Sequence, residues 1–164
     1  MTPWLRRMSE SSALMGSLLR IIHPELYHAG MEAMKSLAEN PDMVKEGDEV
    51  FEVLDWWSTP FSGYSIISNR TTPLHRDNSA RPQWYDLLAS FGTYGYGEVK
   101  LPGIGITLEY RAGTLVALCG KLLQHEVPEV VGNRVCLAHY MRDNVHERLN
   151  IPAPGWMTLS TYGL

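Results

Sequence analysis

The chain has 164 residues, of which 45% are apolar and 20% are charged. This length suits one domain with a hydrophobic core and is too short for two domains of ordinary size. The composition excludes a chain that is disordered throughout. No apolar run approaches the roughly 18 residues of a membrane span, and the first residues lack the pattern of a signal peptide. We therefore expect a soluble, intracellular protein of one domain. A monomer is a separate expectation, which these observations do not establish.

The net charge of −4 and the isoelectric point of about 5.8 bear on the choice of partner. Proteins that hold nucleic acid mainly through its phosphates are usually basic, often with a domain isoelectric point above about 9. If nucleic acid is the substrate, affinity must come from another domain or protein, or from a local basic rim. Candidates for the rim are Arg76, Arg81, Lys100, Arg111, Lys121, Arg142 and Arg148.

The first third of the chain has helical periodicity. Ser11 or Ser12 is predicted to cap a first helix, whose apolar face carries Leu14, Leu18, Leu19 and Ile22. Pro24 suits the first position of a second helix, which Asn40 and Pro41 would end. We expect residues 1–50 to form a helical support.

From about Phe51 onward, short apolar runs alternate with turn residues. Strands are predicted at Gly63–Asn69, Leu74–Asp77, Leu87–Gly92, Glu98–Leu101, Gly105–Tyr110, Thr114–Leu118, Leu122–Val127 and Arg134–Met141. Two helices followed by about eight short strands predict an α+β fold whose strands close into a barrel or jelly roll. The barrel would occupy residues 51–150, followed by a tail of residues 151–164.

The sequence Pro-Leu-His75-Arg-Asp77 contains a His-x-Asp pattern. On an extended segment, residues two apart face the same way, so both side chains would point into the barrel. With a second histidine they would form the two-nitrogen, one-oxygen triad of non-haem Fe(II) oxygenases. Taken alone, the pattern also fits a histidine in a turn beside a solvated aspartate.

His125 and Arg134 extend this pattern along the chain. His125 lies in an apolar strand, where it needs either a metal or a structural hydrogen bond. Arg134 opens another apolar strand, and its planar guanidinium suits a carboxylate such as the distal one of 2-oxoglutarate. The order of His-x-Asp, histidine and arginine favours an oxygenase site.

Four runs of sequence resemble the TET/J-binding-protein group of 2-oxoglutarate dioxygenases, in particular its compact fungal branch. They are Ser68–Asn78, Trp84–Gly92, Tyr110–His125 and Ala138–Arg148. The resemblance implies a double-stranded β-helix fold, Fe(II) and 2-oxoglutarate as cofactors, and a nuclear location. It also implies oxidation of methyl groups on bases of methylated DNA. The base would be 5-methylcytosine, taken to 5-hydroxymethylcytosine and beyond, with thymine and N6-methyladenine as further candidates.

The resemblance also implies roles for individual residues. The catalytic iron ligands would be His75, Asp77 and His125, and Arg134 would anchor 2-oxoglutarate. Arg70 and Cys136 would add contacts to this cosubstrate. Contacts to the substrate are expected from Arg142, Asn69 and Asp86.

Two alternatives stay open on sequence alone. One is the same chemistry on a small molecule, a nucleobase or a protein side chain, which the acidic isoelectric point favours. The other is a non-catalytic binding module of cupin-like fold. A degenerate module would have no chemical need for all four of His75, Asp77, His125 and Arg134, which argues for an enzyme.

Overall fold

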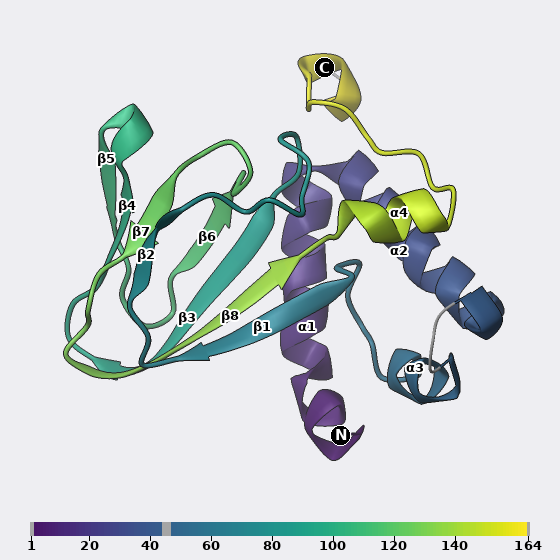
Figure 1. The fold of residues 1–164 in the computed structure, drawn as a ribbon, viewed down its shortest axis with the longest axis horizontal. Helices are drawn as coiled ribbons and strands as arrows, with labels where there is room; N and C mark the ends of the chain where they lie inside the picture. The colour runs from purple at the N-terminus through teal and green to yellow at the C-terminus, as the bar shows by residue number, and fades with distance from the viewer. Residues whose placement is uncertain (1, 44–46, 164) are drawn as a thin grey trace. The chain divides into compact units, whose positions relative to one another are not determined.

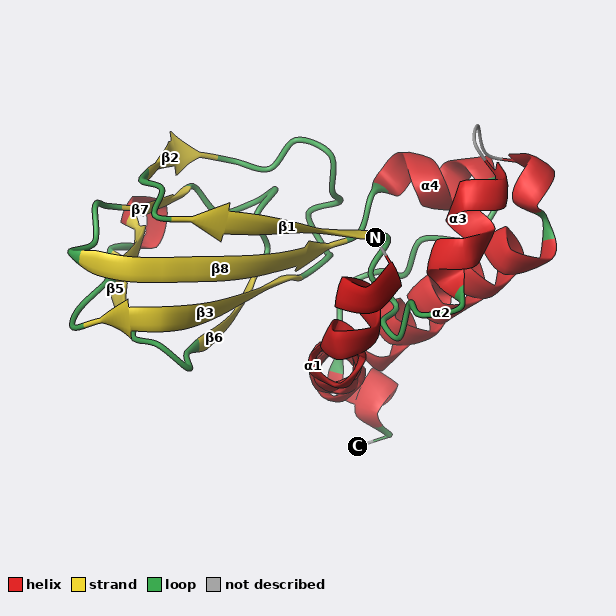
Figure 2. Ribbon diagram, turned by 90° about the horizontal axis from the view of Figure 1, so that it is seen from below, coloured by secondary structure: helices red, strands yellow, loops and turns green. Residues whose placement is uncertain are grey.

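The computed structural model describes residues 2–43 and 47–163. The chain divides into two compact units, one formed by Met1–Ser62 with Arg142–Leu164 and the other by Gly63–Met141. The first unit holds all α-helices of the described residues, and the second holds all their strands (Figure 2). The strand unit spans fewer residues than the barrel of residues 51–150 that the sequence predicts.

The helical unit is built around helix α2, which spans Pro24–Glu39. As predicted, Pro24 opens this helix, and His23 caps it by accepting the backbone N–H of Leu26 on Nδ1 at 3.3 Å. The other elements of this unit are α1 (Thr2–Ile22), α3 (Gly47–Leu54), α4 (Asp143–Arg148) and two 3₁₀ turns, Pro41–Met43 and Leu159–Tyr162. Ala33 and Met34 of α2 pack against Leu149, just after α4, in the core of this unit.

Helix α1 begins at Thr2, so the prediction of a cap at Ser11 or Ser12 is wrong. The helix tolerates serines in its interior because their hydroxyls can bond to the carbonyl of the preceding turn. Ser9 and Ser17 do so, donating to Arg6 O and Ala13 O, each at 2.9 Å. No helix among the described residues is long and apolar enough to cross a membrane.

The described part of the strand unit contains eight strands, one for each strand that the sequence predicts (Figure 1). They are β1 (Gly63–Ser68), β2 (Thr72–His75), β3 (Asp86–Tyr94), β4 (Glu98–Leu101), β5 (Ile106–Glu109), β6 (Leu115–Leu118), β7 (His125–Val127) and β8 (Gly132–Tyr140). They form two four-stranded sheets, in the orders β1-β8-β3-β6 and β2-β7-β4-β5. Within each sheet the paired strands are antiparallel.

Both sheets contribute side chains to one apolar core. The buried members are Val99, Leu101, Tyr110, Val116, Leu118, Val127, Cys136 and Ala138. Two antiparallel sheets that share a core in this way form a jelly roll, as the sequence predicts. The same arrangement brings β2, β7 and β8 together around the residues that the sequence singles out.

Candidate active site

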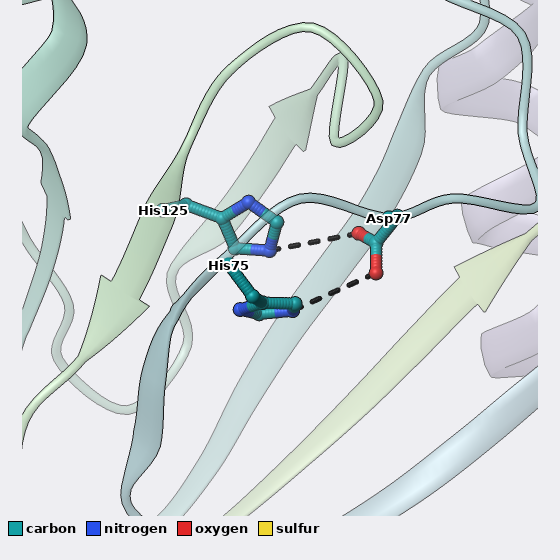
Figure 3. A group of neighbouring side chains, drawn as sticks. All are labelled: His75, Asp77 and His125. Carbon is teal, nitrogen blue, oxygen red and sulfur yellow. Dashed lines mark ion pairs between the residues drawn. The ribbon is translucent and has the colours of Figure 1, made fainter.

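Three potential metal ligands meet at one end of the β2–β7 pair (Figure 3). His75 and His125 are direct partners in the antiparallel register, and their ring centroids lie 4.2 Å apart. The Nε2 atoms of these histidines lie 3.6 Å and 3.5 Å from the two carboxylate oxygens of Asp77. The ligand atoms of the three residues all lie within 4.8 Å of one another. Two nitrogens and one oxygen at this spacing could hold a single metal ion.

Each imidazole is oriented by a hydrogen bond to the backbone carbonyl two residues earlier in the chain. Nδ1 of His75 lies 2.9 Å from Pro73 O, and Nδ1 of His125 lies 3.1 Å from Leu123 O. A carbonyl can only accept, so each Nδ1 carries the proton and donates it. The Nε2 lone pairs are thereby left facing Asp77, as a metal-binding histidine requires.

The environment of His125 favours its neutral form. Burial lowers the pKa of this imidazole, and the nearby His75 acts in the same direction. The hydrogen bond to Leu123 O and the Asp77 carboxylate oppose this shift. Because only a neutral imidazole binds a metal, His125 is ready to act as a ligand at neutral pH.

The predicted strand Leu74–Asp77 includes Asp77, but β2 ends at His75, so Asp77 lies in the loop beyond it. The loop that carries it is tied to the loop after β6. The N–H of Asp77 donates to Gly120 O at 3.0 Å, Arg76 Nε donates to Leu122 O at 3.1 Å, and Lys121 Nζ donates to Asn78 O at 2.8 Å. These three bonds hold the loop that carries the carboxylate against the loop after β6.

Gly120 makes a close approach that the sequence does not reveal, because a Gly-Lys pair indicates only a turn. A Cβ atom at this position would collide with the Asp77 carboxylate and would lie 2.7 Å from Asp86 Oδ2. Gly120 is therefore the residue that leaves room for the Asp77 side chain. Asp86, a predicted substrate contact, is buried at the start of β3 and lies beside the same glycine.

Arg134 is buried at the start of β8, with 3% of its surface exposed. Its Nη1 donates to Arg70 O at a long 3.4 Å, and its guanidinium carbon lies 5.1 Å from the centroid of the Tyr110 ring. Among the described residues, no side chain or backbone group bonds its Nε, and no carboxylate pairs with its charge. A guanidinium so placed is suited to bind an anion.

A cavity of about 250 Å³ opens beside this arginine. Its lining residues are Asn69, Arg70, Thr71, Glu129, Val130, Gly132 and Arg134. The two arginines to which the resemblance gives a cosubstrate role thus line one hollow. Its volume accommodates a small dicarboxylate.

Cys136 and Tyr110 lie next to Arg134 inside the strand unit. Cys136 is a buried free thiol, and its Sγ lies 3.3 Å from the hydroxyl of Tyr110. No sequence pattern singles out Tyr110 as a site residue. The available signal was a hydroxyl-bearing aromatic at the end of the apolar run Gly105–Tyr110.

The remaining predicted contacts have different surroundings. Asn69 lies beside Arg134 and holds its backbone: Oδ1 accepts the Arg134 N–H at 2.7 Å, and the Asn69 N–H donates to Arg134 O at 2.8 Å. Arg142 follows the end of β8 and is the N-cap of α4, where its N–H donates to Ser62 Oγ at 2.8 Å. Strand alternation therefore does not set the direction of the Arg142 side chain.

The donor set fits a non-haem iron with 2-oxoglutarate. Two imidazoles and one carboxylate leave coordination positions open for a chelating cosubstrate and oxygen. The side chains of His75 and Asp77 are 36% and 41% exposed, so the triad is accessible from outside. The uncompensated charge of Arg134 suits the distal carboxylate of the cosubstrate.

Comparison with known proteins agrees with this chemistry. The model of the TET/JBP family, described as the oxygenase domain of the 2OGFeDO superfamily, matches residues 3–143. The chain is similar to the solved structure of NgTET1 in complex with 5mC DNA, at 14% identity and a TM-score of 0.50. That match covers 66% of this chain and 43% of the NgTET1 chain, so this chain spans less than half of the NgTET1 length.

An RmlC-like cupin protein from Desulfovibrio desulfuricans also matches, at 19% identity and a TM-score of 0.33, over 46% of this chain and 69% of the cupin. No curated protein matches the chain. The likeness to NgTET1 is consistent with the double-stranded β-helix that the two sheets form. Because the family model covers residues 3–143, the chain belongs to the TET/JBP family of Fe(II)- and 2-oxoglutarate-dependent oxygenase domains.

Proposed function

We propose that this protein oxidises methyl groups on DNA bases, with 5-methylcytosine as the first substrate to test. In this proposal His75, Asp77 and His125 bind Fe(II), and Arg134 anchors 2-oxoglutarate with help from Arg70 and Cys136. The observation that carries it is the convergence of the three ligand atoms within 4.8 Å in a chain of the TET/JBP family. The likeness to NgTET1, which was solved with 5mC DNA, favours DNA as the substrate.

The side chains of this site would contribute positioning more than proton transfer. When bound, Fe(II) and 2-oxoglutarate supply the oxygen-activating chemistry that oxidises a methyl C–H bond. His75 and His125 present fixed Nε2 lone pairs, and the bonds between the loops of Asp77 and Gly120 hold the carboxylate ready. A prearranged ligand set of this kind needs no reorganisation when the metal binds.

A base in duplex DNA must leave the stack to reach such a site. Asp86, Asn69 and Arg142 are proposed to contact the substrate. Arg76 and Lys121 lie on the two loops that surround Asp77, where they could meet the phosphates that flank a flipped base. Such a local basic pair would serve a chain whose net charge is −4.

The test is turnover by the purified full chain with Fe(II), 2-oxoglutarate and oligonucleotides that carry 5-methylcytosine, N6-methyladenine, thymine or unmodified cytosine. Succinate release and mass spectrometry of the bases are followed together. We expect succinate release that 5-methylcytosine DNA stimulates, with hydroxymethylcytosine as the first product. His125→Ala should abolish both signals, while His28→Ala, at an exposed helix position, should retain them.

Each other result has a defined meaning. Succinate release that no oligonucleotide stimulates would keep the oxygenase but move the substrate to a nucleobase, a small molecule or a protein side chain. Stimulation by N6-methyladenine or thymine alone would change the base. Unchanged turnover in His125→Ala would contradict the assigned metal site.

A further inference from the structure

The charge of Arg134 meets no carboxylate among the described residues, yet it does meet two neutral groups. The face of the Tyr110 ring lies beneath the guanidinium, with 5.1 Å between the guanidinium carbon and the ring centroid. The Tyr110 hydroxyl lies 3.3 Å from Cys136 Sγ. Tyr110 is fully buried and Cys136 is 2% exposed, so solvent does not satisfy these groups.

Both groups keep their protons at physiological pH. Burial raises the pKa of the Tyr110 hydroxyl strongly, and the Cys136 thiol adds to this effect. Burial likewise raises the pKa of Cys136. The Arg134 guanidinium opposes both shifts without cancelling them, which also shows that it lies close to both groups. The guanidinium is thus accompanied by an O–H and an S–H, neither of which neutralises it.

The backbone around Tyr110 is held in place from two sides. Its N–H donates to Gly97 O at 2.7 Å, and its carbonyl accepts the Tyr94 hydroxyl at 2.8 Å. The Tyr94 hydroxyl is in turn bonded to Ser90 Oγ at 2.5 Å. Ser90 lies opposite Cys136 in the β3–β8 register, so these contacts connect the two sides of the Arg134 surroundings.

We infer that Tyr110 is a cosubstrate-binding residue whose hydroxyl, together with the Cys136 thiol, donates to the distal carboxylate of 2-oxoglutarate at Arg134. This inference rests on the proposed role of Arg134 as the anchor. An anion that enters would receive charge from the guanidinium and hydrogen bonds from two protonated donors. The O–H and S–H, which now face each other, would each gain a stronger acceptor.

The test compares two ligands that differ only in the distal carboxylate: 2-oxoglutarate and 2-oxopentanoate. Each is titrated anaerobically into the Fe(II)-loaded full chain, and Kd is taken from the metal-to-ligand charge-transfer absorbance. The Kd of 2-oxopentanoate divided by the Kd of 2-oxoglutarate is the ratio that measures how much the distal carboxylate contributes to binding. Tyr110→Phe should reduce this ratio about tenfold, because one hydrogen bond to a charged group is lost. A purely structural role would weaken both ligands equally and leave the ratio unchanged.

Tyr96→Phe is the matched control, because it removes an exposed tyrosine hydroxyl that bonds Glu98 and that belongs to none of the contacts around Tyr110 described above. It should leave the ratio unchanged. Cys136→Ser keeps a donor and should preserve or raise the ratio, whereas Cys136→Ala should lower it severalfold. If Tyr110→Phe does not fold, as judged by its thermal unfolding, the two Cys136 variants decide the question.

Arg134→Met distinguishes the role of Tyr110 from the role of the Arg134 anchor. A collapsed ratio in Arg134→Met with an unchanged ratio in Tyr110→Phe would overturn the role of Tyr110 and leave the anchor intact. An unchanged ratio in Arg134→Met would overturn the proposed anchor itself. A reduced ratio in both variants supports the inference.

Discussion

His75 and His125 are direct partners across the β2–β7 ladder, with their ring centroids 4.2 Å apart. They are separated along the chain by fifty positions, so the register of two short strands sets the metal geometry. A slip of one residue would turn one imidazole to the opposite face of the sheet. The hydrogen bonds that the Nδ1 atoms donate to Pro73 O and Leu123 O then fix which nitrogen of each ring faces Asp77.

Removing one ligand should therefore remove most of the metal affinity. Asp77→Asn retains the shape of the side chain but loses the charge, and we expect the affinity for Fe(II) or Co(II) to fall at least tenfold. His75→Gln should lower the affinity for the metal by at least as much. Visible absorption of the Co(II) complex under anaerobic conditions measures this change. His28→Gln is the control, and an equal loss in that variant would show that the metal binds elsewhere.

Gly120→Ala should have a similar effect without touching a ligand. Its Cβ would collide with the Asp77 carboxylate and lie 2.7 Å from Asp86 Oδ2, so the carboxylate must move. We expect at least a tenfold loss of Co(II) affinity with only a modest change in the unfolding midpoint. Gly95→Ala is the control, since a Cβ there meets no atom within 4 Å. Unchanged Co(II) affinity in Gly120→Ala would show that Asp77 does not depend on this close approach.

Much of the strand unit is encoded locally, which explains why sequence patterns predict it. Alternating apolar residues and glycine turns mark each strand, as in β6, whose buried positions alternate with exposed ones. The His-x-Asp pattern and the arginine in an apolar strand are likewise local. Their convergence is predicted from the order of these motifs along the chain and from the family resemblance, and the β2–β7 register brings the two histidines together.

What the sequence did not reveal depends on contacts between distant segments. The roles of Gly120 and Tyr110 arise only when Asp77 and Arg134 approach them. Helix α4 has six residues, too few for a periodic apolar pattern. The early start of α1 was hidden because serine is typical of helix caps, although it also occurs within helices.

Buried His139 should make the unfolding free energy depend on pH. Burial lowers its pKa from 6.5 to about 4, and 1% of the residue is exposed. As pH falls through 6.5 the unfolded chain gains a proton that the folded chain does not bind, so stability is lost until pH reaches about 4. The full effect is about 3 kcal/mol, of which about 2 kcal/mol would be lost by pH 5.

Urea unfolding of the metal-free chain at pH 7.5 and pH 5 measures this loss. His139→Phe keeps a ring beside Tyr64, whose centroid lies 5.5 Å away, and it cannot titrate. Its loss of stability between the two pH values should be smaller than that of the wild type by about 2 kcal/mol. A residual slope is expected, because burial also lowers the pKa of His23 and His125. An equal loss of unfolding free energy between pH 7.5 and pH 5 in wild type and His139→Phe would show that burial does not lower the pKa of His139.

Asn69 should matter for both stability and cosubstrate binding. It has a φ of 48°, in the left-handed region, and its side chain and backbone bond both polar groups of the Arg134 backbone. Asn69→Ala removes the acceptor and strains the turn. We expect the free energy of unfolding to fall by about 2 kcal/mol and the Kd for 2-oxoglutarate to rise severalfold. Asn69→Gly relieves the strain but still lacks the acceptor, so it should lose only about 1 kcal/mol.

The control for Asn69 is Asn150→Ala, a position with a φ of 54° in the helical unit. This variant carries a comparable backbone strain, so it should lower the unfolding free energy but leave the Kd for 2-oxoglutarate unchanged. Urea unfolding and anaerobic titration on the same protein preparations compare the two sites. If Asn69→Ala lost stability while keeping the wild-type Kd, its clamp on β8 would serve the fold alone. A weaker Kd in Asn69→Ala and not in Asn150→Ala would show that the clamp positions Arg134 for its anion.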